Sequence, residues 1–205
     1  MSIYPEILST IYQLEKEFDL IPEERKNRLK KLANYIASKT AKGVDIQLNF
    51  ICTHNSRRSH LGQIWAATAA HYFGIQQLQS FSGGTEATAF NTSAIAALER
   101  LGFQIDHTSG KNPHYMVHYA YETAPLECFS KVYDDPFNPV QHFAAVMTCS
   151  DADDNCPFIP GAEQRIALTY EDPKISDGSP QEAATYEERA RQIGRELLFA
   201  FHQLA

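Results

Sequence analysis

The sequence predicts an α/β protein of three layers (α/β/α), with a parallel four-stranded sheet between helices and a helical hairpin at the N-terminus. Segments with a period of two alternate with segments of helical period between residues 45 and 204, which is typical of parallel strands joined by helices. Two further helical stripes precede this region. The chain of 205 residues, 43% of them hydrophobic, is long enough to bury one sizeable core.

The N-terminal segment carries two amphipathic stripes. Apolar residues recur at helical spacing in residues 4–18 and again in residues 22–40, and the chain turns between them near Asp19. We interpret residues 1–43 as a helical hairpin extension of a catalytic domain that spans residues 44–205. No residue in the extension suggests chemistry, so we expect a structural role, as a lid or as the arm of a homodimer.

The first strand of the main domain delivers a cysteine to a loop. Ile46, Leu48 and Phe50 alternate with polar residues, and the run ends at Cys52. A helical pattern begins beyond Arg58. The predicted order is therefore strand, polar loop, helix.

The remaining elements mostly keep this rhythm. We predict strands at residues 77–82, 143–148 and 165–169 and helices at residues 92–101 and 181–204. Alternating strands and helices imply a parallel sheet with helices on both faces. Residues 110–142 break the rhythm. Because tyrosines and a valine alternate from Tyr115 to Tyr121, we predict an inserted hairpin or loop there.

Charge and composition exclude several classes of partner. The formal net charge is −7, and no run of Lys or Arg is long enough to follow a phosphate backbone, which excludes nucleic acid as a partner. We find no secretory leader and no stretch of about eighteen apolar residues, so we expect a cytoplasmic protein without a membrane partner. In that reducing compartment the four cysteines are expected to be reactive or buried rather than disulfide-bonded.

Residues 52–59 have the composition of an anion-binding loop. A loop that enters a helix N-terminus directs successive backbone N–H groups inward, and a tetrahedral oxyanion fits such a nest. The planar fork of Arg58 can bind two oxygens of that anion and stabilise the transition state. The same positive field favours the thiolate form of Cys52, and Ser59 can donate a hydrogen bond to it. We therefore interpret Cys52 as a nucleophile rather than a structural thiol.

This segment resembles the low-molecular-weight protein tyrosine phosphatases and the thioredoxin-coupled arsenate reductases that share their fold. The resemblance covers residues 46–204, apart from residues 110–142. It implies that Cys52 is the nucleophile, that Arg58 binds the oxyanion and that Asp172, followed by Pro173, is the general acid. Asp135-Pro136 is a rival pair at the wrong place for the family. The loop residues implied to bind the oxyanion are Thr53, His54, Asn55, Ser56, Arg57, Arg58 and Ser59.

Two further cysteines separate the branches of this family. Cys149 and Cys156 are joined by a polar segment, which suits sequential disulfide exchange. Two thiolates lack the four ligands of structural zinc, so we predict no metal and no cofactor. The stretch is similar to the redox segment of thioredoxin-coupled arsenate reductases. The resemblance implies that Cys149 displaces arsenite from Cys52, that Cys156 then takes Cys149 into a disulfide, and that thioredoxin reduces it.

The sequence departs from the family at several positions. His54 stands where many relatives have glycine, and Arg57 where many have cysteine or a small or neutral residue. Gln63 occupies a position that is acidic in some arsenate reductases, which argues against potassium activation. Cys128 matches no family cysteine and is assigned no role.

The sequence is compatible with three functions, which we rank as follows. We expect reduction of arsenate to arsenite, with hydrolysis of phosphotyrosine or a small phosphoester as the alternative. Both would use an arsenate or phosphate oxyanion in the same loop. A third interpretation is a non-catalytic oxyanion-binding or redox-sensing protein. The intact set of Cys52, Arg58 and Asp172 argues against it.

Overall fold

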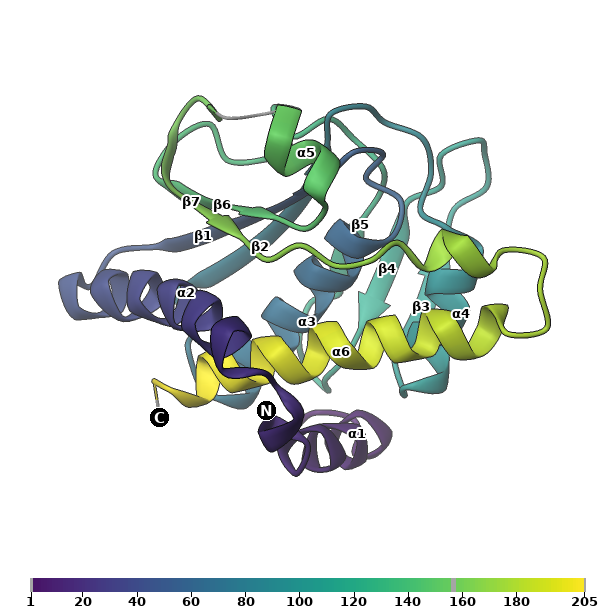
Figure 1. Ribbon diagram of the computed structural model, residues 1–205, viewed down its shortest axis with the longest axis horizontal. Helices are drawn as coiled ribbons and strands as arrows, with labels where there is room; N and C mark the ends of the chain where they lie inside the picture. The colour runs from purple at the N-terminus through teal and green to yellow at the C-terminus, as the bar shows by residue number, and fades with distance from the viewer. Residues whose placement is uncertain (1, 156–157, 205) are drawn as a thin grey trace.

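The computed structural model describes residues 2–155 and 158–204, and a parallel sheet of four strands in the order β2-β1-β6-β7 lies at its centre (Figure 1). The strands are β1 (Ile46–Cys52), β2 (Leu78–Gly84), β6 (Phe143–Met147) and β7 (Ala162–Ala167). This confirms the predicted sheet. Cys52 pairs with Gly84 of β2, and Ile51 pairs with Met147 of β6. The carboxyl ends of β1, β2 and β6 therefore meet at one edge, where open parallel sheets bind ligands.

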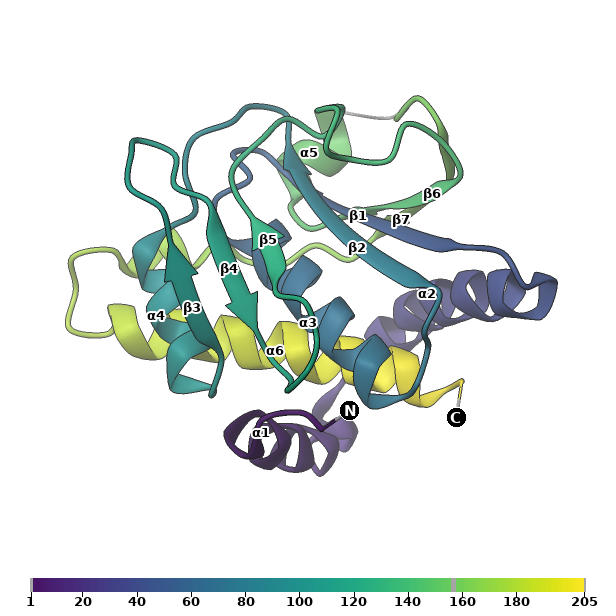
Figure 2. The same ribbon diagram turned by 180° about the vertical axis from the view of Figure 1, so that it is seen from behind.

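Three long helices cover one face of the sheet, as the two opposite views show (Figures 1 and 2). They are α2 (Glu23–Lys42), α3 (Arg58–Tyr72) and α6 (Glu182–His202). Helices α3 and α6 approach closely because Gly194 has no side chain: a Cβ there would lie 2.6 Å from the ring of Trp65. This packing fixes α3, and with it the loop that precedes α3.

The opposite face of the sheet has a thinner cover. A second apolar cluster on this side includes Ile51, Ala145 and Met147, and the short helix α5 (Ser150–Asn155) and the chain near Tyr133 pack on it. The predicted helical cover is present on both faces, and on this face it consists of the single short helix α5 with irregular chain. The irregular residues 129–142 take this position because the side chain of Asn49, on this face of β1, donates to the Tyr133 carbonyl at 3.1 Å.

The predicted N-terminal helices are α1 (Pro5–Glu15) and α2, joined by the short 3₁₀ helix η1 (Phe18–Leu20). Both α1 and α2 pack against α6. Their apolar stripes, which suggested a lid or a dimerisation arm, are buried in the same hydrophobic cluster as the helices of the main domain. Glu17 accepts hydrogen bonds from Arg191 and Arg195 of α6, at 2.7 and 2.8 Å. These contacts join the N-terminal segment to the core.

A separate antiparallel sheet follows α4 (Thr92–Arg100), in the order β3-β4-β5 (Figure 2). Its strands are β3 (Gln104–His107), β4 (Tyr115–His118) and β5 (Leu126–Cys128). The predicted hairpin corresponds to β4 and β5. Strand β3 was not predicted, because its four residues are mostly exposed and polar and show no alternation. The alternating tyrosines also extend past the end of β4.

Strand β7 begins three residues before the predicted start at Arg165. It lies at the edge of the sheet, where its first residues are partly exposed and polar, so the apolar pattern marks only its second half. The segment after β7 leads through the 3₁₀ helix η2 (Pro173–Ser176) to α6. Within the described part of the chain, no helix is both long and apolar enough to cross a membrane.

Candidate active site

The loop between β1 and α3 is held by hydrogen bonds to its carbonyl groups. Thr85 N donates to Cys52 O at 3.1 Å and Glu86 N to Thr53 O at 2.9 Å. The hydroxyls of Thr88 and Ser130 both donate to the next carbonyl, that of His54, at 3.1 Å. Because the carbonyls face these outer donors, the peptide N–H groups on the other side of the loop are directed inward. This is the arrangement of an anion nest.

Gly84 allows the neighbouring turn to approach this loop. A Cβ at Gly84 would lie 2.6 Å from Thr53 O and 2.7 Å from Asn55 N, closer than real Cβ contacts permit. The turn at Ser82-Gly83-Gly84 therefore lies directly against the anion loop. Its second glycine is required by packing.

Asn55 fixes the shape of the loop from inside. Its backbone has a positive φ of 43°, a conformation that asparagine tolerates better than most residues. The buried side chain donates from Nδ2 to Ser59 Oγ at 2.8 Å and accepts at Oδ1 from Lys131 N at 2.9 Å. Asn55 thereby connects the loop, the start of α3 and the segment that follows β5.

The thiol of Cys52 lies 3.1 Å from Ser59 Oγ. Since the Ser59 oxygen already accepts a hydrogen bond from Asn55 Nδ2, its own O–H is available to donate to the sulfur. Cys52 ends β1 and Arg58 begins α3, so the sulfur faces the positive end of a fifteen-residue helix. The Ser59 hydroxyl is thus placed to donate a hydrogen bond to the Cys52 sulfur.

Arg58 is almost completely buried at the first position of α3. Its Nη1 donates to Tyr170 O at 2.9 Å, and its Nη2 donates to Asp172 Oδ2 at 2.7 Å. Asp172 also caps η2, because its Oδ1 accepts from Lys174 N at 3.1 Å. The structure therefore brings Cys52, Arg58 and Asp172 to one site, although Asp172 lies more than a hundred residues from the loop in sequence.

Cys149 lies beside the loop and is fully buried. Its Sγ is 3.4 Å from Thr53 Oγ1 and accepts a hydrogen bond from Ala152 N at 3.4 Å. Cys52 and Cys149 belong to the same small cluster on the thinly covered face of the sheet. The third predicted redox residue, Cys156, lies outside the described residues.

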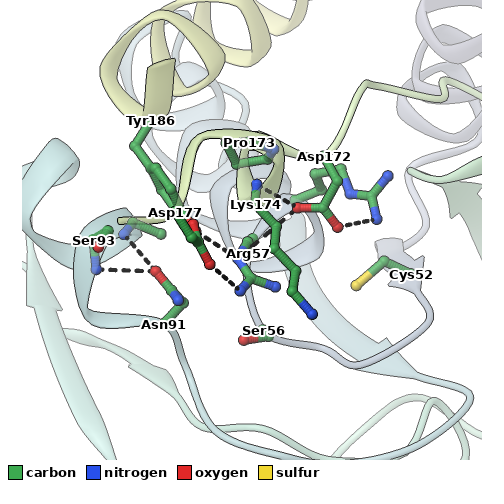
Figure 3. A network of polar contacts seen from close by, with 12 residues as sticks. Cys52, Ser56, Arg57, Asn91, Ser93, Asp172, Pro173, Lys174, Asp177 and Tyr186 are labelled. Atoms are coloured by element: carbon green, nitrogen blue, oxygen red, sulfur yellow. Dashed lines mark hydrogen bonds and ion pairs between the residues drawn. The ribbon is translucent and has the colours of Figure 1, made fainter. Parts of the chain in front are cut away.

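Three predicted loop residues have side chains engaged away from the anion pocket. His54 is half-exposed and pairs through Nε2 with Glu86 Oε1 at 2.9 Å. The Ser56 hydroxyl donates to Ala89 O at 2.7 Å. Arg57 donates from Nε to the Tyr186 hydroxyl at 2.8 Å (Figure 3). An anion in the nest would meet these residues mainly through their backbone.

A buried polar network under the loop was not predicted from the sequence. His60 stacks on Phe90 at 4.1 Å, and its Nδ1 lies 3.2 Å from Ser82 Oγ, which donates to Gln63 Oε1 at 2.6 Å. Burial, together with the charge of Lys131, holds the pKa of His60 well below its usual value. His60 is therefore neutral. No local pattern reveals this, since a histidine in an apolar helix face has the same sequence signal in any role.

The side chain of Gln63 forms hydrogen bonds within the protein at both of its polar atoms. Its Oε1 accepts from Ser82 Oγ, and its Nε2 donates to Glu127 O at 3.5 Å. In residues 2–155 and 158–204, no three His, Cys, Asp or Glu side chains are grouped so as to hold a metal ion. Cys128 is buried beyond this network, and burial raises the pKa of its thiol to about 12. It is inert in this environment.

Comparison with solved structures shows the fold. A low-molecular-weight phosphotyrosine phosphatase from Vibrio cholerae O395 matches with a TM-score of 0.52 at 13% identity, over 78% of this chain and 96% of that chain. An arsenate reductase solved in the phosphate binding state matches with a TM-score of 0.50 at 17% identity, over 78% of this chain and 99% of that chain.

Comparison with curated proteins shows the family. Arsenate reductase 2 of Staphylococcus epidermidis is 30% identical over 125 residues, which are 60% of this chain and 76% of the relative. The arsenate reductase of Bacillus subtilis is 28% identical over 149 residues, which are 72% of this chain and 89% of the relative. No protein-family model matches the chain. On the strength of these relatives, the chain belongs to the arsenate reductase family, and it has the fold of the low-molecular-weight protein tyrosine phosphatases.

Proposed function

We propose that the protein reduces arsenate to arsenite, with Cys52 as nucleophile and Cys149 and Cys156 as the thiols that supply the electrons. One observation carries the proposal: the buried Cys149 thiol lies against the anion loop, 3.4 Å from Thr53 Oγ1 and in the same apolar cluster as Cys52. A phosphatase has no use for a second thiol at this place. Similarity to curated arsenate reductases supports the same assignment.

The proposed reaction begins with binding of the oxyanion to the loop N–H groups and the Arg58 fork. The Cys52 thiolate attacks arsenic and forms an S–As bond, while one arsenate oxygen leaves as water after taking a proton from Asp172. The thiolate of Cys149 then attacks Cys52 Sγ. The S–As bond breaks, and its electron pair reduces As(V) to As(III), which leaves as arsenite.

The second exchange regenerates the nucleophile. After arsenite has left, Cys52 and Cys149 form a disulfide. The Cys156 thiolate attacks Cys149 Sγ, releases the Cys52 thiolate and leaves a disulfide between Cys149 and Cys156. A reduced dithiol protein of the thioredoxin class supplies the two electrons that open this disulfide. We assign the reaction to the cytoplasm, because it consumes reduced thiols in every turnover.

The test is multiple-turnover arsenate reduction with thioredoxin, thioredoxin reductase and NADPH. We expect Cys52→Ser, Cys149→Ser and Cys156→Ser each to abolish turnover, because each breaks a chain of exchanges without a parallel route. Cys128→Ser is the matched control, since it removes a buried thiol outside the site and should keep turnover.

Peptide mapping after arsenate treatment gives the second readout. The Cys156→Ser protein should trap a disulfide between Cys52 and Cys149, and the unaltered protein should hold one between Cys149 and Cys156. An unaltered protein that forms neither disulfide, yet still hydrolyses p-nitrophenyl phosphate, would overturn the reductase assignment.

Phosphoester hydrolysis is the second candidate, and the complete set of Cys52, Arg58 and Asp172 favours it. Attack by Cys52 on phosphorus and protonation of an alkoxide leaving group by Asp172 need neither Cys149 nor Cys156. Hydrolysis of p-nitrophenyl phosphate should therefore survive serine at either position and disappear in Cys52→Ser.

A further inference from the structure

Arg57 links the anion loop to both ends of η2, the segment that begins at the general acid (Figure 3). Its guanidinium Nη2 lies 3.5 Å from Asp177 Oδ2, and its Nε lies 3.9 Å from Asp172 Oδ1. Asp172 precedes η2 and Asp177 follows it. One arginine at the end of the loop is therefore within ion-pair distance of both carboxylates that flank this 3₁₀ helix.

Two further contacts keep the Arg57 side chain in this position. Its Nε donates to the Tyr186 hydroxyl at 2.8 Å, and that hydroxyl donates to Asp177 Oδ1 at 2.7 Å. Tyr186 is fully buried in α6, and burial, reinforced by its hydrogen bond to Asp177, raises its pKa to about 12. The side chain of Arg57 is only 13% exposed. It is thus a nearly buried cation with fixed partners.

Asp172 lies between two arginines that differ in their access to the substrate. Arg58 donates to Oδ2 at 2.7 Å, whereas Arg57 Nε lies 3.9 Å from Oδ1. An oxyanion in the nest competes with Asp172 for the Arg58 fork, because one guanidinium cannot bind both anions along the same edge. Asp172 is one-third exposed, and its Oδ1 accepts from Lys174 N at 3.1 Å and lies 3.9 Å from Arg57 Nε. When Arg58 binds an oxyanion, Arg57 is the second cation still paired with this carboxylate.

We propose that Arg57 is a positioning residue for Asp172, which it retains over Cys52 when the bound oxyanion takes Arg58. Asp177 and Tyr186 hold the Arg57 side chain at the acid and away from the nest. The inference rests on the proposed function, in which Asp172 donates the proton. It differs from the sequence-based expectation, in which Arg57 itself binds the oxyanion.

The test compares leaving groups that need the acid to different degrees. With phenyl phosphate, a poor leaving group, Arg57→Gln should lower kcat by about 10-fold or more, part of the roughly 10² to 10⁴-fold that proton transfer contributes. With p-nitrophenyl phosphate the loss should be about threefold or less, since little protonation is needed. KM should stay nearly unchanged, and Arg57→Lys should restore part of the rate.

The same comparison in an Asp172→Asn background separates this inference from the proposed function. Arg57→Gln should cost nothing further there, because the group that it positions is absent. The single-turnover rate of arsenate-driven disulfide formation between Cys52 and Cys149, in a Cys156→Ser protein, should follow the same pattern. Arg100→Gln removes a surface arginine that pairs with Glu187 and is the matched control.

Several outcomes overturn the inference. A raised KM with unchanged kcat in Arg57→Gln would mean that Arg57 binds the oxyanion directly. A full additional loss in the Asp172→Asn background would assign Arg57 a role independent of the acid. If Asp172→Asn keeps a normal rate with the poor leaving group, Asp172 is not the general acid, and the inference fails together with that assignment.

Tyr186→Phe keeps the test decisive if Arg57→Gln folds poorly. This variant keeps the ring in the core and deletes only the hydroxyl that accepts the hydrogen bond from Arg57 Nε. It should show a smaller loss with the same dependence on the leaving group. A loss that is equal for both phosphoesters would contradict the positioning role.

Discussion

Arg58 donates a 2.7 Å hydrogen bond to Asp172, so the arginine proposed to bind the oxyanion and the proposed acid are paired with each other. Arg58 Nε is buried and has no hydrogen-bond partner among the described residues, so this N–H is among the donors that an incoming oxyanion can use. We therefore expect an oxyanion bound to Arg58 to weaken the pairing of Arg58 with Asp172. The first prediction follows from this pair.

Asp172→Asn should affect binding and turnover in opposite directions. Turnover of a phosphoester with a poor leaving group should fall by roughly 10² to 10⁴-fold, the range for lost proton transfer. Phosphate or arsenate should bind as tightly as before or more tightly, because no carboxylate competes for Arg58. Calorimetric titration beside steady-state kinetics measures both. Asp135→Asn, at the other Asp-Pro pair, should change neither; weaker oxyanion binding by Asp172→Asn would contradict the coupling.

Ser59→Ala should slow the chemical step. The hydroxyl is the donor that faces the Cys52 thiolate, and a hydrogen bond to a charged group contributes about 1.5–3 kcal/mol, which corresponds to roughly a 10- to 100-fold loss in rate. Ser59→Thr keeps a hydroxyl and should keep most of the rate. Single-turnover kinetics with arsenate measures the step. Equal losses in both variants would mean that the rate falls because the packing at position 59 is disturbed, and that the hydroxyl donor is not the cause.

His60 should make the protein less stable as the pH falls. Its folded-state pKa is lowered well below 6.5 by burial, so below about pH 6.5 the unfolded chain binds one more proton than the folded one. The free energy of unfolding should then fall toward pH 5, by up to about 1.4 kcal/mol per pH unit from this group. Urea denaturation of His60→Gln between pH 7 and 5 should show a shallower slope, and the exposed His107→Gln should keep the original one.

Cys128 should resist alkylation in the folded protein. With its pKa raised to about 12 by burial, almost none of this thiol is ionised at pH 8, and no reagent reaches it. Iodoacetamide treatment and peptide mapping should find Cys52 modified and Cys128 unmodified, with both modified in urea. Labelling of Cys128 at the rate of a free thiol in native buffer would show that the region beneath the loop opens.

The N-terminal helices should unfold together with the sheet. Ile11 is fully buried in the cluster that also contains the helices of the main domain, so Ile11→Ala should cost about 2–5 kcal/mol in one cooperative transition. Tyr12→Ala, at the half-exposed neighbouring position, should change stability by about 0.5 kcal/mol or less. A biphasic transition would instead identify residues 1–43 as a separately folding unit.

The sequence by itself determined the local part of this architecture. The change from a period of two to a helical period around Cys52 and Arg58 predicted β1, the loop and α3, because each pattern records which side of a single element is buried. The anion loop occupies eight consecutive residues, so its composition was also visible. Strand β3 and the start of β7 were not predicted, since partly exposed edge strands show no such pattern.

Only the tertiary structure decided which partners the charged and polar side chains take. Asp172 meets Arg58 across 114 positions, Asn55 meets Lys131 across 76, and Arg57 meets Tyr186 across 129. Resemblance to a family assigned Arg58 and Asp172 to one site, but it predicted none of these three contacts. A hydrogen bond depends on a few tenths of an ångström between distant segments, and the packing of α6, η2 and the chain after β5 against the loop sets that distance. The periodicity of the sequence indicates only which side of an element is buried, so it cannot predict these pairs.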